Sequence, residues 1–432
     1  MADVFYSVRP AGAGSGNDLK VACNIVIATG VATFSVAQTG DIGVGCYVLS
    51  SNTDGYISEM TDSTHAKIIT ALGATHANVS SEALTSVYHP YASLSAAEAG
   101  SDDANHLNTA DLTSGDGFNL FWPCYGATAD TAYLVVVNTA WTTSDTHSIK
   151  IFSVRGIDEK DSINNWRNNT TKWSDSFFHM VCSRTYNGVI NVTSVDIEIE
   201  GIQINNTGAK GSQPFGIEGS SFSGITFKAD SCFIKSTGTG TATSGAGIST
   251  RNHKGTNVHI TNNVIYDWYN GYIDGWPTGV GNNYIFNNTV VNSAHDGIVC
   301  GSVTDQNLRL ANNVSQNNVN KDYIAYNVDY SASNISDDTT SPNSSFREIT
   351  LTFNDASSDD YSLASTDTDA LDAGVDMSTY MDAVDIIGTV RPQSTAWDIG
   401  AFEFPVAVAA GAIINQFQKA NLGADLFNGS LI

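Results

Sequence analysis

The sequence predicts an all-β protein, a right-handed parallel β-helix with a small antiparallel β unit at the N-terminus and a C-terminal extension. Three observations support this fold class. An apolar pattern returns at roughly 25 to 31 residues, a second pattern returns in step with it, and charged residues make up only 15% of the chain beside 38 glycines. This interval is typical of a solenoid, and the composition is typical of short strands joined by tight turns.

Both patterns recur at equivalent positions along the chain. The first runs through the segments that begin at Ile199, Ala229, Ile260, Ile285 and Leu310. The second runs through Gly216-Ile217-Glu218, Gly247-Ile248-Ser249, Gly271-Tyr272-Ile273, Gly297-Ile298-Val299 and Tyr323-Ile324-Ala325. Because stacked coils pair equivalent strands at ~4.8 Å, equivalent residues should form columns. We predict a β-helix over residues 91–350, with regular coils at about 195–330.

Two asparagine columns follow from this alignment. Their members are Asn262, Asn287 and Asn312 in one column, and Asn263, Asn288 and Asn313 in the next. Asparagine accepts left-handed backbone geometry at a bend and can form hydrogen bonds with a stacked neighbour. We interpret both columns as structural rather than sugar-binding.

The first 90 residues predict a separate antiparallel β unit that docks or caps the β-helix. Residues 24–28 and 31–36 alternate around Thr29-Gly30 and indicate a hairpin. Two further strand-like runs, 45–49 and 65–69, flank a turn at 52–55. Beyond them, a short helix at 94–99 and strands at 133–137 and 148–152 are expected to form the entry to the β-helix and its first coils.

Charge and cysteine usage exclude several classes of partner. The net charge of −25 should repel nucleic acid and anionic lipid. The six cysteines have no spacing typical of metal ligands, so we predict small buried thiols and no metal site, and calcium has no support. The apolar run at 406–414 is too short for a bilayer, which needs ~20 residues. We therefore expect no membrane insertion, and we interpret residues 405–432 as a subunit contact.

The C-terminal part carries an ordered set of motifs. They are Asp360-Tyr361-Ser362-Leu363, Leu371-Asp372-Ala373-Gly374, the run from Asp385 to Pro392, and the run from Asp398 to Glu403. This order resembles the C-terminal signature of right-handed β-helix proteins of the pectate-lyase-like superfamily, and residues 30–45 are similar to segments of phage-encoded members. The resemblance implies that residues 351–404 close the end of the solenoid. It also implies that Asp372, Arg391, Asp398 and Glu403 form a buried or semi-buried ion-pair network and are not catalytic residues.

Many members of that superfamily cleave acidic polysaccharides, so the resemblance raises the question of a catalytic site. Hydrolysis needs two facing carboxylates, and lyases of this fold use an acidic calcium cluster. Acids in the aligned columns look isolated. Weak catalytic candidates are Asp267, Asp274, His295 and Asp296. Carbohydrate-binding candidates are Trp268, Tyr269, Tyr272 and Trp276, which are equally well explained as core or as a subunit contact.

The sequence therefore favours a structural and adhesive virion protein of a bacteriophage, a spike, fibre or decoration subunit. No basic and apolar leader follows Met1, which predicts assembly in a host cytoplasm and a final place on the virion surface. Expected partners are further copies in a homotrimer, other virion proteins and a host surface glycan. The alternatives are a polysaccharide hydrolase or lyase acting as a tailspike depolymerase, and a secreted, extracellular bacterial adhesin.

Overall fold

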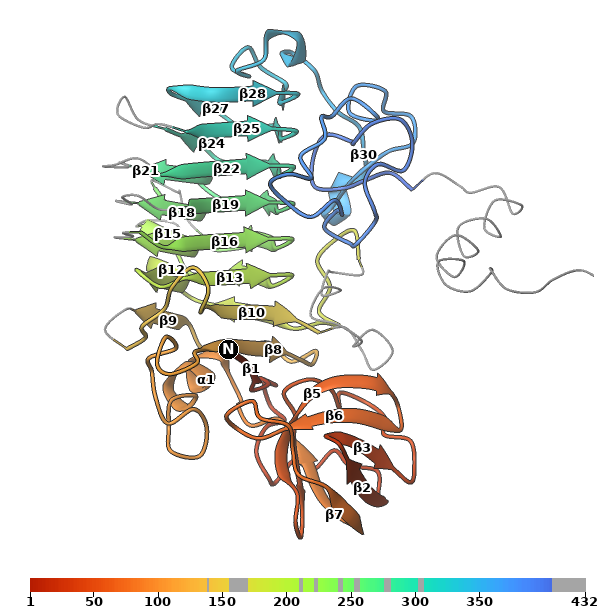
Figure 1. The fold of residues 1–432 in the computed structure, drawn as a ribbon. Helices are drawn as coiled ribbons and strands as arrows, with labels where there is room; N and C mark the ends of the chain where they lie inside the picture. Colours follow the sequence, from red (N-terminus) through yellow and green to blue (C-terminus); the bar gives the residue numbers. More distant parts are fainter. Residues whose placement is uncertain are drawn as a thin grey trace, which may run out of the picture.

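The computed structural model describes residues 1–137, 140–154, 170–209, 213–220, 224–239, 244–251, 257–275, 281–301 and 307–405. These residues form a right-handed parallel β-helix with a small barrel at its N-terminal end, which confirms the predicted fold class (Figure 1). The candidate Trp276 and, from residue 406 onward, the predicted subunit contact at residues 405–432 lie outside the described residues. In the described part of the chain, no helix is long and apolar enough to cross a membrane.

Three parallel sheets form the walls of the β-helix. Sheet 1 contains, in order, β1 (Ala2–Phe5), β8 (Phe118–Cys124), β10 (Ile149–Ser153), β13 (Ile197–Glu200), β16 (Thr226–Asp230), β19 (Asn257–Thr261), β22 (Asn282–Phe286), β25 (Leu308–Ala311) and β28 (Val328–Ala332). Sheet 2 contains β11 (His179–Cys182), β14 (Gln203–Asn206), β17 (Phe233–Ser236), β20 (Val264–Tyr266), β23 (Thr289–Val291), β26 (Val314–Gln316) and β29 (Ile335–Ser336). Sheet 3 contains β9 (Leu134–Val137), β12 (Tyr186–Thr193), β15 (Gln213–Ser220), β18 (Ala246–Arg251), β21 (Asn270–Gly275), β24 (Asp296–Cys300) and β27 (Lys321–Ala325).

The strand registers match the two sequence patterns, with one exception. In sheet 1 the pairing runs from Ile199 through Ala229, Ile260 and Ile285 to Leu310, as predicted. In sheet 3 the second pattern also holds as far as β24, but Ile298 pairs with Tyr323. The predicted alignment of Tyr323 with Gly297 is therefore wrong by one residue. The final coil carries Asp322 where the earlier coils carry a glycine, so the glycine that marks this position in the sequence is missing there.

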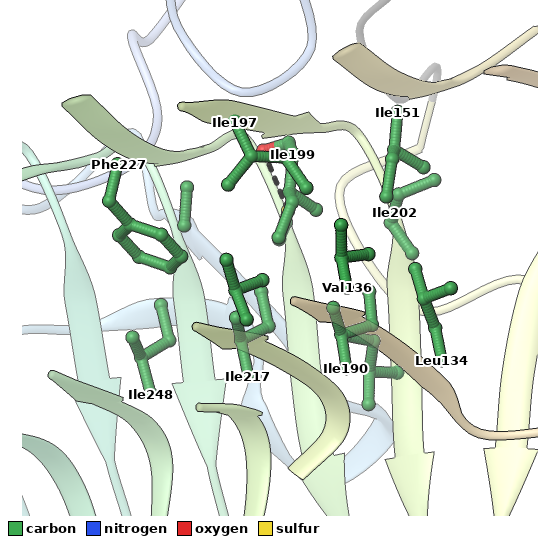
Figure 2. Packing of buried hydrophobic residues seen from close by; sticks show 14 of the residues in the cluster. Leu134, Val136, Ile151, Ile190, Ile197, Ile199, Ile202, Ile217, Phe227 and Ile248 are labelled. Carbon is green, nitrogen blue, oxygen red and sulfur yellow. Dashed lines mark hydrogen bonds between the residues drawn. The ribbon is translucent and has the colours of Figure 1, made fainter. Parts of the chain in front are cut away.

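Alternation along each strand separates core from surface. Ile197 and Ile199 of β13 point into the coil, whereas Glu198 between them points outward. Figure 2 shows inward side chains from several coils packed together, among them Val136, Ile217 and Phe227. Parallel strands stacked in register place like residues over like, so one continuous apolar column runs through the coils.

The asparagine columns lie at the bend between sheets 1 and 2. Asn262, Asn287 and Asn312 all have positive φ angles, between 54° and 56°, at the bend itself. In the adjacent column the Nδ2 of Asn263 donates to Oδ1 of Asn288, and that of Asn288 donates to Oδ1 of Asn313, both at 3.0 Å. The chain thus uses one column to turn and the next to join the coils.

The N-terminal unit is a closed six-stranded antiparallel barrel. Its strands, in barrel order, are β2 (Asn24–Ala28), β3 (Val31–Phe34), β6 (His65–Ile69), β5 (Asp54–Asp62), β4 (Tyr47–Ser50) and β7 (Val79–Tyr88). Thr29 and Gly30 have φ angles of 50° and 78°, which closes the predicted β2–β3 hairpin. The predicted unit of residues 1–90 begins too early, because β1 pairs in parallel with β8 and belongs to the β-helix. Helix α1 (Leu94–Gly100) follows the barrel, and its N-terminus is capped by the Ser93 hydroxyl.

The C-terminal region lies along the flank of the coils and not over their end (Figure 1). It contains β30 (Phe353–Asp355), β31 (Asp360–Leu363) and the 3₁₀ turn η3 (Ala356–Ser358), whereas the earlier 3₁₀ turn η2 (Ser344–Phe346) belongs to the segment beyond the last coil. The outer asparagines bind it directly, since Nδ2 of Asn262 donates to the Val384 carbonyl and Nδ2 of Asn312 to the Val375 carbonyl. The expected end closure is therefore wrong, because the motifs meet the side of the bend.

Candidate functional site

Among the catalytic candidates whose side chains the structure describes, Asp267 lies at a bend of the coils and Asp296 begins β24, directly after a bend. Asp296 is 5% exposed, and its carboxylate accepts from Nδ2 of Asn320 at 2.7 Å and lies 2.6 Å from Nδ1 of His295. Asp267 occupies a bend with a φ of 63°, in the same column as Asn292 and Asn317, which also have positive φ. The side chain of Asp274 is outside the described set. This corner has the contacts expected of a structural bend.

Two of the four predicted carbohydrate-binding candidates are core residues, which is the alternative explanation of them. Trp268 and Tyr272 are 2% and 1% exposed, and both belong to the apolar interior of the coils. Nε1 of Trp268 donates a hydrogen bond to the Ile234 carbonyl, and the Tyr272 hydroxyl forms a hydrogen bond with the Thr250 hydroxyl. Of the four candidates, Tyr269 lies at the surface and stacks on His295 with ring centroids 4.8 Å apart. Neither Trp268 nor Tyr272 can stack on a sugar from solvent.

The motif residues of the C-terminal region lie together, but through two kinds of contact. Arg391 and Glu403 form an ion pair at 3.0 Å with side chains 0% and 1% exposed. The Asp398 carboxylate accepts hydrogen bonds from the backbone N–H groups of Asp372 and Phe404. The Asp372 carboxylate accepts hydrogen bonds from the backbone N–H groups of Thr395 and Ala396. Burial raises the pKa of Glu403, and Arg391 opposes that effect. These residues fasten loops to one another.

A polar grid, which sequence reasoning missed, covers the outer face of sheet 1. It consists of two rows that cross β13, β16 and β19: Glu198, Lys228 and His259 in the first, and Glu200, Asp230 and Thr261 in the second. Residues of one row are strand partners, and the two rows are two residues apart along each strand. Their side chains therefore share one face at the spacing of the coils.

A lysine from the preceding coil organises the charges at one edge of this grid. Nζ of Lys150, on β10, lies 2.5 Å from Glu200 and 2.9 Å from Glu198. Burial alone would lower the pKa of Lys150, but the two carboxylates outweigh it and raise the pKa. For Glu198, burial is likewise outweighed by Lys150 and Lys228, so its pKa is lowered. Glu198 is ionised at neutral pH, and its side chain remains 28% exposed.

His259 is the neutral member of the first row. Burial, helped by the neighbouring Lys228, lowers the pKa of His259 to about 4. Its ring lies against Tyr284 of the next coil, with centroids 4.7 Å apart. An uncharged imidazole can both donate and accept a hydrogen bond, so His259 offers both functions at neutral pH.

The C-terminal region supplies the opposite wall. The loop at residues 378–382 stands over the grid and completes a groove of about 300 Å³, which we call the sheet 1 groove; its lining residues are Glu198, Lys228, Asp230, His259, Thr261, Ser378, Thr379, Tyr380, Met381 and Asp382. Tyr380 is fixed by stacking on Tyr284 at 5.3 Å and by a hydrogen bond from Arg309 at 2.7 Å. The wall is held by contacts with the coils themselves.

A second hollow, of about 680 Å³, lies at the beginning of the same three strands. Thr226 and Asn257 line it from their strands and Asp196 from just before β13, and the segment at 141–145 also lines it. Asp196 accepts from the Thr226 backbone N–H and from the Thr143 hydroxyl, and burial raises its pKa. Thr226 and Asn257 begin β16 and β19, and later residues of the same two strands line the sheet 1 groove, so the hollow and the groove follow each other along sheet 1.

The groove is chemically suited to a polyhydroxylated ligand that carries no negative charge. Its lining presents three carboxylates, from Glu198, Asp230 and Asp382, against the ammonium of Lys228. It also offers the Thr261 hydroxyl and the neutral His259. In the described part of the chain, no cluster of three or more His, Cys, Asp or Glu residues is arranged to hold a metal ion.

Comparisons with known proteins add little to this geometry. No protein-family model matches the chain, and no curated protein matches it. Among solved structures, the chain is similar to the crystal structure of pectate lyase Pel9A, at 13% identity and a TM-score of 0.23, over 73% of this chain and 91% of that one. A similarity of this size carries no information about what this chain binds or catalyses.

Proposed function

We propose that this chain is a glycan-binding, adhesive structural protein of a bacteriophage particle, in which the β-helix presents the sheet 1 groove to a host surface glycan. The observation that carries the proposal is the polar grid itself. Carboxylate, hydroxyl, imidazole and ammonium groups recur on neighbouring coils at ~4.8 Å, beneath the wall of residues 378–382. A row of this kind can meet successive hydroxyl groups of an extended sugar chain.

The charge of the lining selects among glycans. Three carboxylates face the groove, and the chain as a whole carries a net charge of −25. A uronate polymer would bring like charges together at close range, which is unfavourable in a partly buried site. We therefore infer that the glycan is neutral or carries amino sugars.

Binding of host surface polysaccharide to the purified protein tests the proposal. Lys228→Ala and Asp382→Ala change exposed groove residues, and Lys321→Ala and Asp329→Ala are matched controls on exposed parts of other coils. We expect each groove variant to weaken binding about tenfold, the effect of losing a charge-assisted hydrogen bond, and the controls to bind normally. Equal binding by all four variants would refute the groove as the glycan site.

A second candidate is polysaccharide hydrolysis, and one observation favours it. Asp196, directly before β13, and Glu198, within it, are two residues apart in the sequence, and their pKa values are shifted in opposite directions. Such a pair can serve as general acid and base. Asp196 is only 2% exposed, however, which leaves little access for a leaving group. Release of reducing ends that is abolished by Glu198→Gln would establish the enzyme.

For the setting of the protein we propose a phage-encoded β-helix protein of the pectate-lyase-like superfamily, on a virion surface and as a homotrimer with other virion proteins as partners. The support is the ordered set of motifs between Asp360 and Glu403. Native mass measurement and co-fractionation with particles test this setting. A monomer that remains apart from every particle would count against it and would leave the glycan experiment intact.

A further inference from the structure

A cleft lined by tyrosines lies where the barrel meets the first part of the β-helix. It measures about 570 Å³ and is lined by Tyr47, Asp54, Tyr56, Tyr88, Pro90, Ala104, Asn105 and His106. The barrel strands β4, β5 and β7 supply the tyrosines and Asp54, and the segment after α1 supplies Asn105 and His106. The cleft is distinct from the sheet 1 groove, with which it shares no lining residue.

The tyrosines form one rung across three neighbouring strands. Tyr47 is the strand partner of Tyr88 on one side and of Tyr56 on the other. The ring centroid of Tyr47 lies 5.1 Å from that of Tyr88 and 5.2 Å from that of Tyr56. Tyr47 and Tyr88 are half-buried, whereas Tyr56 is 3% exposed and serves as backing. Two adjoining aromatic rings thus remain accessible from the cleft.

The wall behind these rings is rigid. Tyr6 packs edge-on against Tyr56 at 4.9 Å and against His106 at 4.8 Å, and its hydroxyl donates to the Ala71 carbonyl at 2.6 Å. The imidazole of His106 is held by Asp103 at 2.7 Å. A ligand would therefore meet a formed surface, which limits the entropy lost on binding.

The polar groups of the cleft complement the aromatic wall. The exposed Asp54 carboxylate can accept hydrogen bonds from ligand hydroxyls, and the exposed Asn105 amide can both donate and accept them. Burial, with Asp54 close by, raises the pKa of both Tyr47 and Tyr88, so their phenols stay protonated and can donate. No lysine or arginine is among the lining residues, and Asp54 and Asp103 make the cleft negative.

We propose that this cleft is a binding site for a single pyranose residue that is not acidic. The apolar C–H face of such a sugar fits on the Tyr47 and Tyr88 rings, and its hydroxyl edge meets Asp54 and Asn105. The volume lies within the range of ~300 to 1,000 Å³ that is usual for small-ligand sites. The site combines barrel and β-helix residues, so it exists only in the intact chain.

The test uses the full-length protein with three probes, methyl glucoside, methyl glucosaminide and methyl glucuronide, in saturation-transfer NMR and calorimetry. We expect the first two to bind and the glucuronide to bind at least about tenfold more weakly, since Asp54 repels it. Tyr88→Ala and Asp54→Asn should each weaken glucoside binding about tenfold, whereas Tyr88→Phe should retain stacking. Tyr326→Ala, at a tyrosine that is 52% exposed elsewhere, is the matched control and should bind normally.

Three results would overturn the proposal: no probe bound by the folded wild-type protein, equal affinity for the glucuronide, or unchanged binding by both Tyr88→Ala and Asp54→Asn. Unfolding temperatures identify variants that have lost the fold, and Asp54→Asn, at an exposed position, keeps the test valid if Tyr88→Ala is unstable. The groove variant Lys228→Ala should leave probe binding intact. The two sites therefore succeed or fail separately.

Discussion

Replacing Asn288 by alanine should destabilise the β-helix far more than its size suggests. The side chain is 1% exposed. Its Nδ2 donates to the Ile260 carbonyl at 2.7 Å and to Oδ1 of Asn313 at 3.0 Å, and its Oδ1 accepts from both the backbone N–H and Nδ2 of Asn263 at 3.0 Å. One residue thus joins its own coil to the coils on both sides.

The magnitude follows from the groups that Asn288→Ala would leave without this partner. A buried polar group that loses its partner costs about 1 to 3 kcal/mol, and the backbone N–H of Asn263 and the carbonyl of Ile260 both face the missing amide. With the small cavity added, we expect about 3 to 5 kcal/mol of lost unfolding free energy. Asn282→Ala is the matched control, because the partly buried Asn282 donates one bond to Asn257 at 2.8 Å.

Urea unfolding followed by circular dichroism measures both variants against the wild type. The control should lose about 1 kcal/mol, the ordinary net value of one hydrogen bond. A loss in Asn288→Ala that is no larger than the loss in Asn282→Ala would refute the reasoning, because the column would then not join the coils. Glycan binding in the sheet 1 groove should be unchanged in folded Asn288→Ala, since the residue faces another side of the coil.

Two further predictions concern buried charge. Arg391→Met should lower the free energy of unfolding by about 3 to 5 kcal/mol, because it leaves the Glu403 carboxylate buried without its cation. Adding Glu403→Leu to this variant should restore part of the loss. Strictly additive effects of the two substitutions in urea unfolding would contradict the ion pair. The pKa of His259 in the folded protein, about 4, lies below its usual value near 6.5, so the folded state resists protonation and stability falls as pH drops from 6.5 towards 4. Wild type should lose up to about 3 kcal/mol more than His259→Gln between pH 7 and pH 4, and an imidazole that titrates near 6.5 by NMR would contradict this.

The coils could be predicted because their cause is local. Ile199, Ala229 and Ile260 recur at the same inward position of successive strands, and the following residues, Gly201, Ser231 and Asn262, all have positive φ angles. Periodic burial and bend chemistry are both visible in a single sequence. The pairing of β1 with β8 could not be predicted from the sequence, because 112 residues separate the two strands and they share no repeated sequence pattern.

Part of the sheet 1 groove could be predicted from the sequence. Aligning the segments on Ile199, Ala229 and Ile260 also stacks the next residues, Glu200 and Asp230, so adjacent acids were present in the alignment. The predicted acidic candidates, Asp267, Asp274 and Asp296, lie at the bends and along the second pattern, away from this row on sheet 1. The wall at Tyr380 could not be found in this way, since its position depends on loop contacts with Tyr284 and Arg309 of distant coils.

The two asparagine columns have different tasks, and the difference links the fold to the site. Asn263, Asn288 and Asn313 bond mainly to other coils and hold the solenoid together. The outer asparagines turn their amides to the C-terminal region, as Nδ2 of Asn287 does to the carbonyls of Asp398 and Gly400 at 3.2 Å. Those bonds fix the C-terminal region along the bend that ends sheet 1, so residues 378–382 can stand over its outer face. The bend asparagines therefore help to build the groove without lining it.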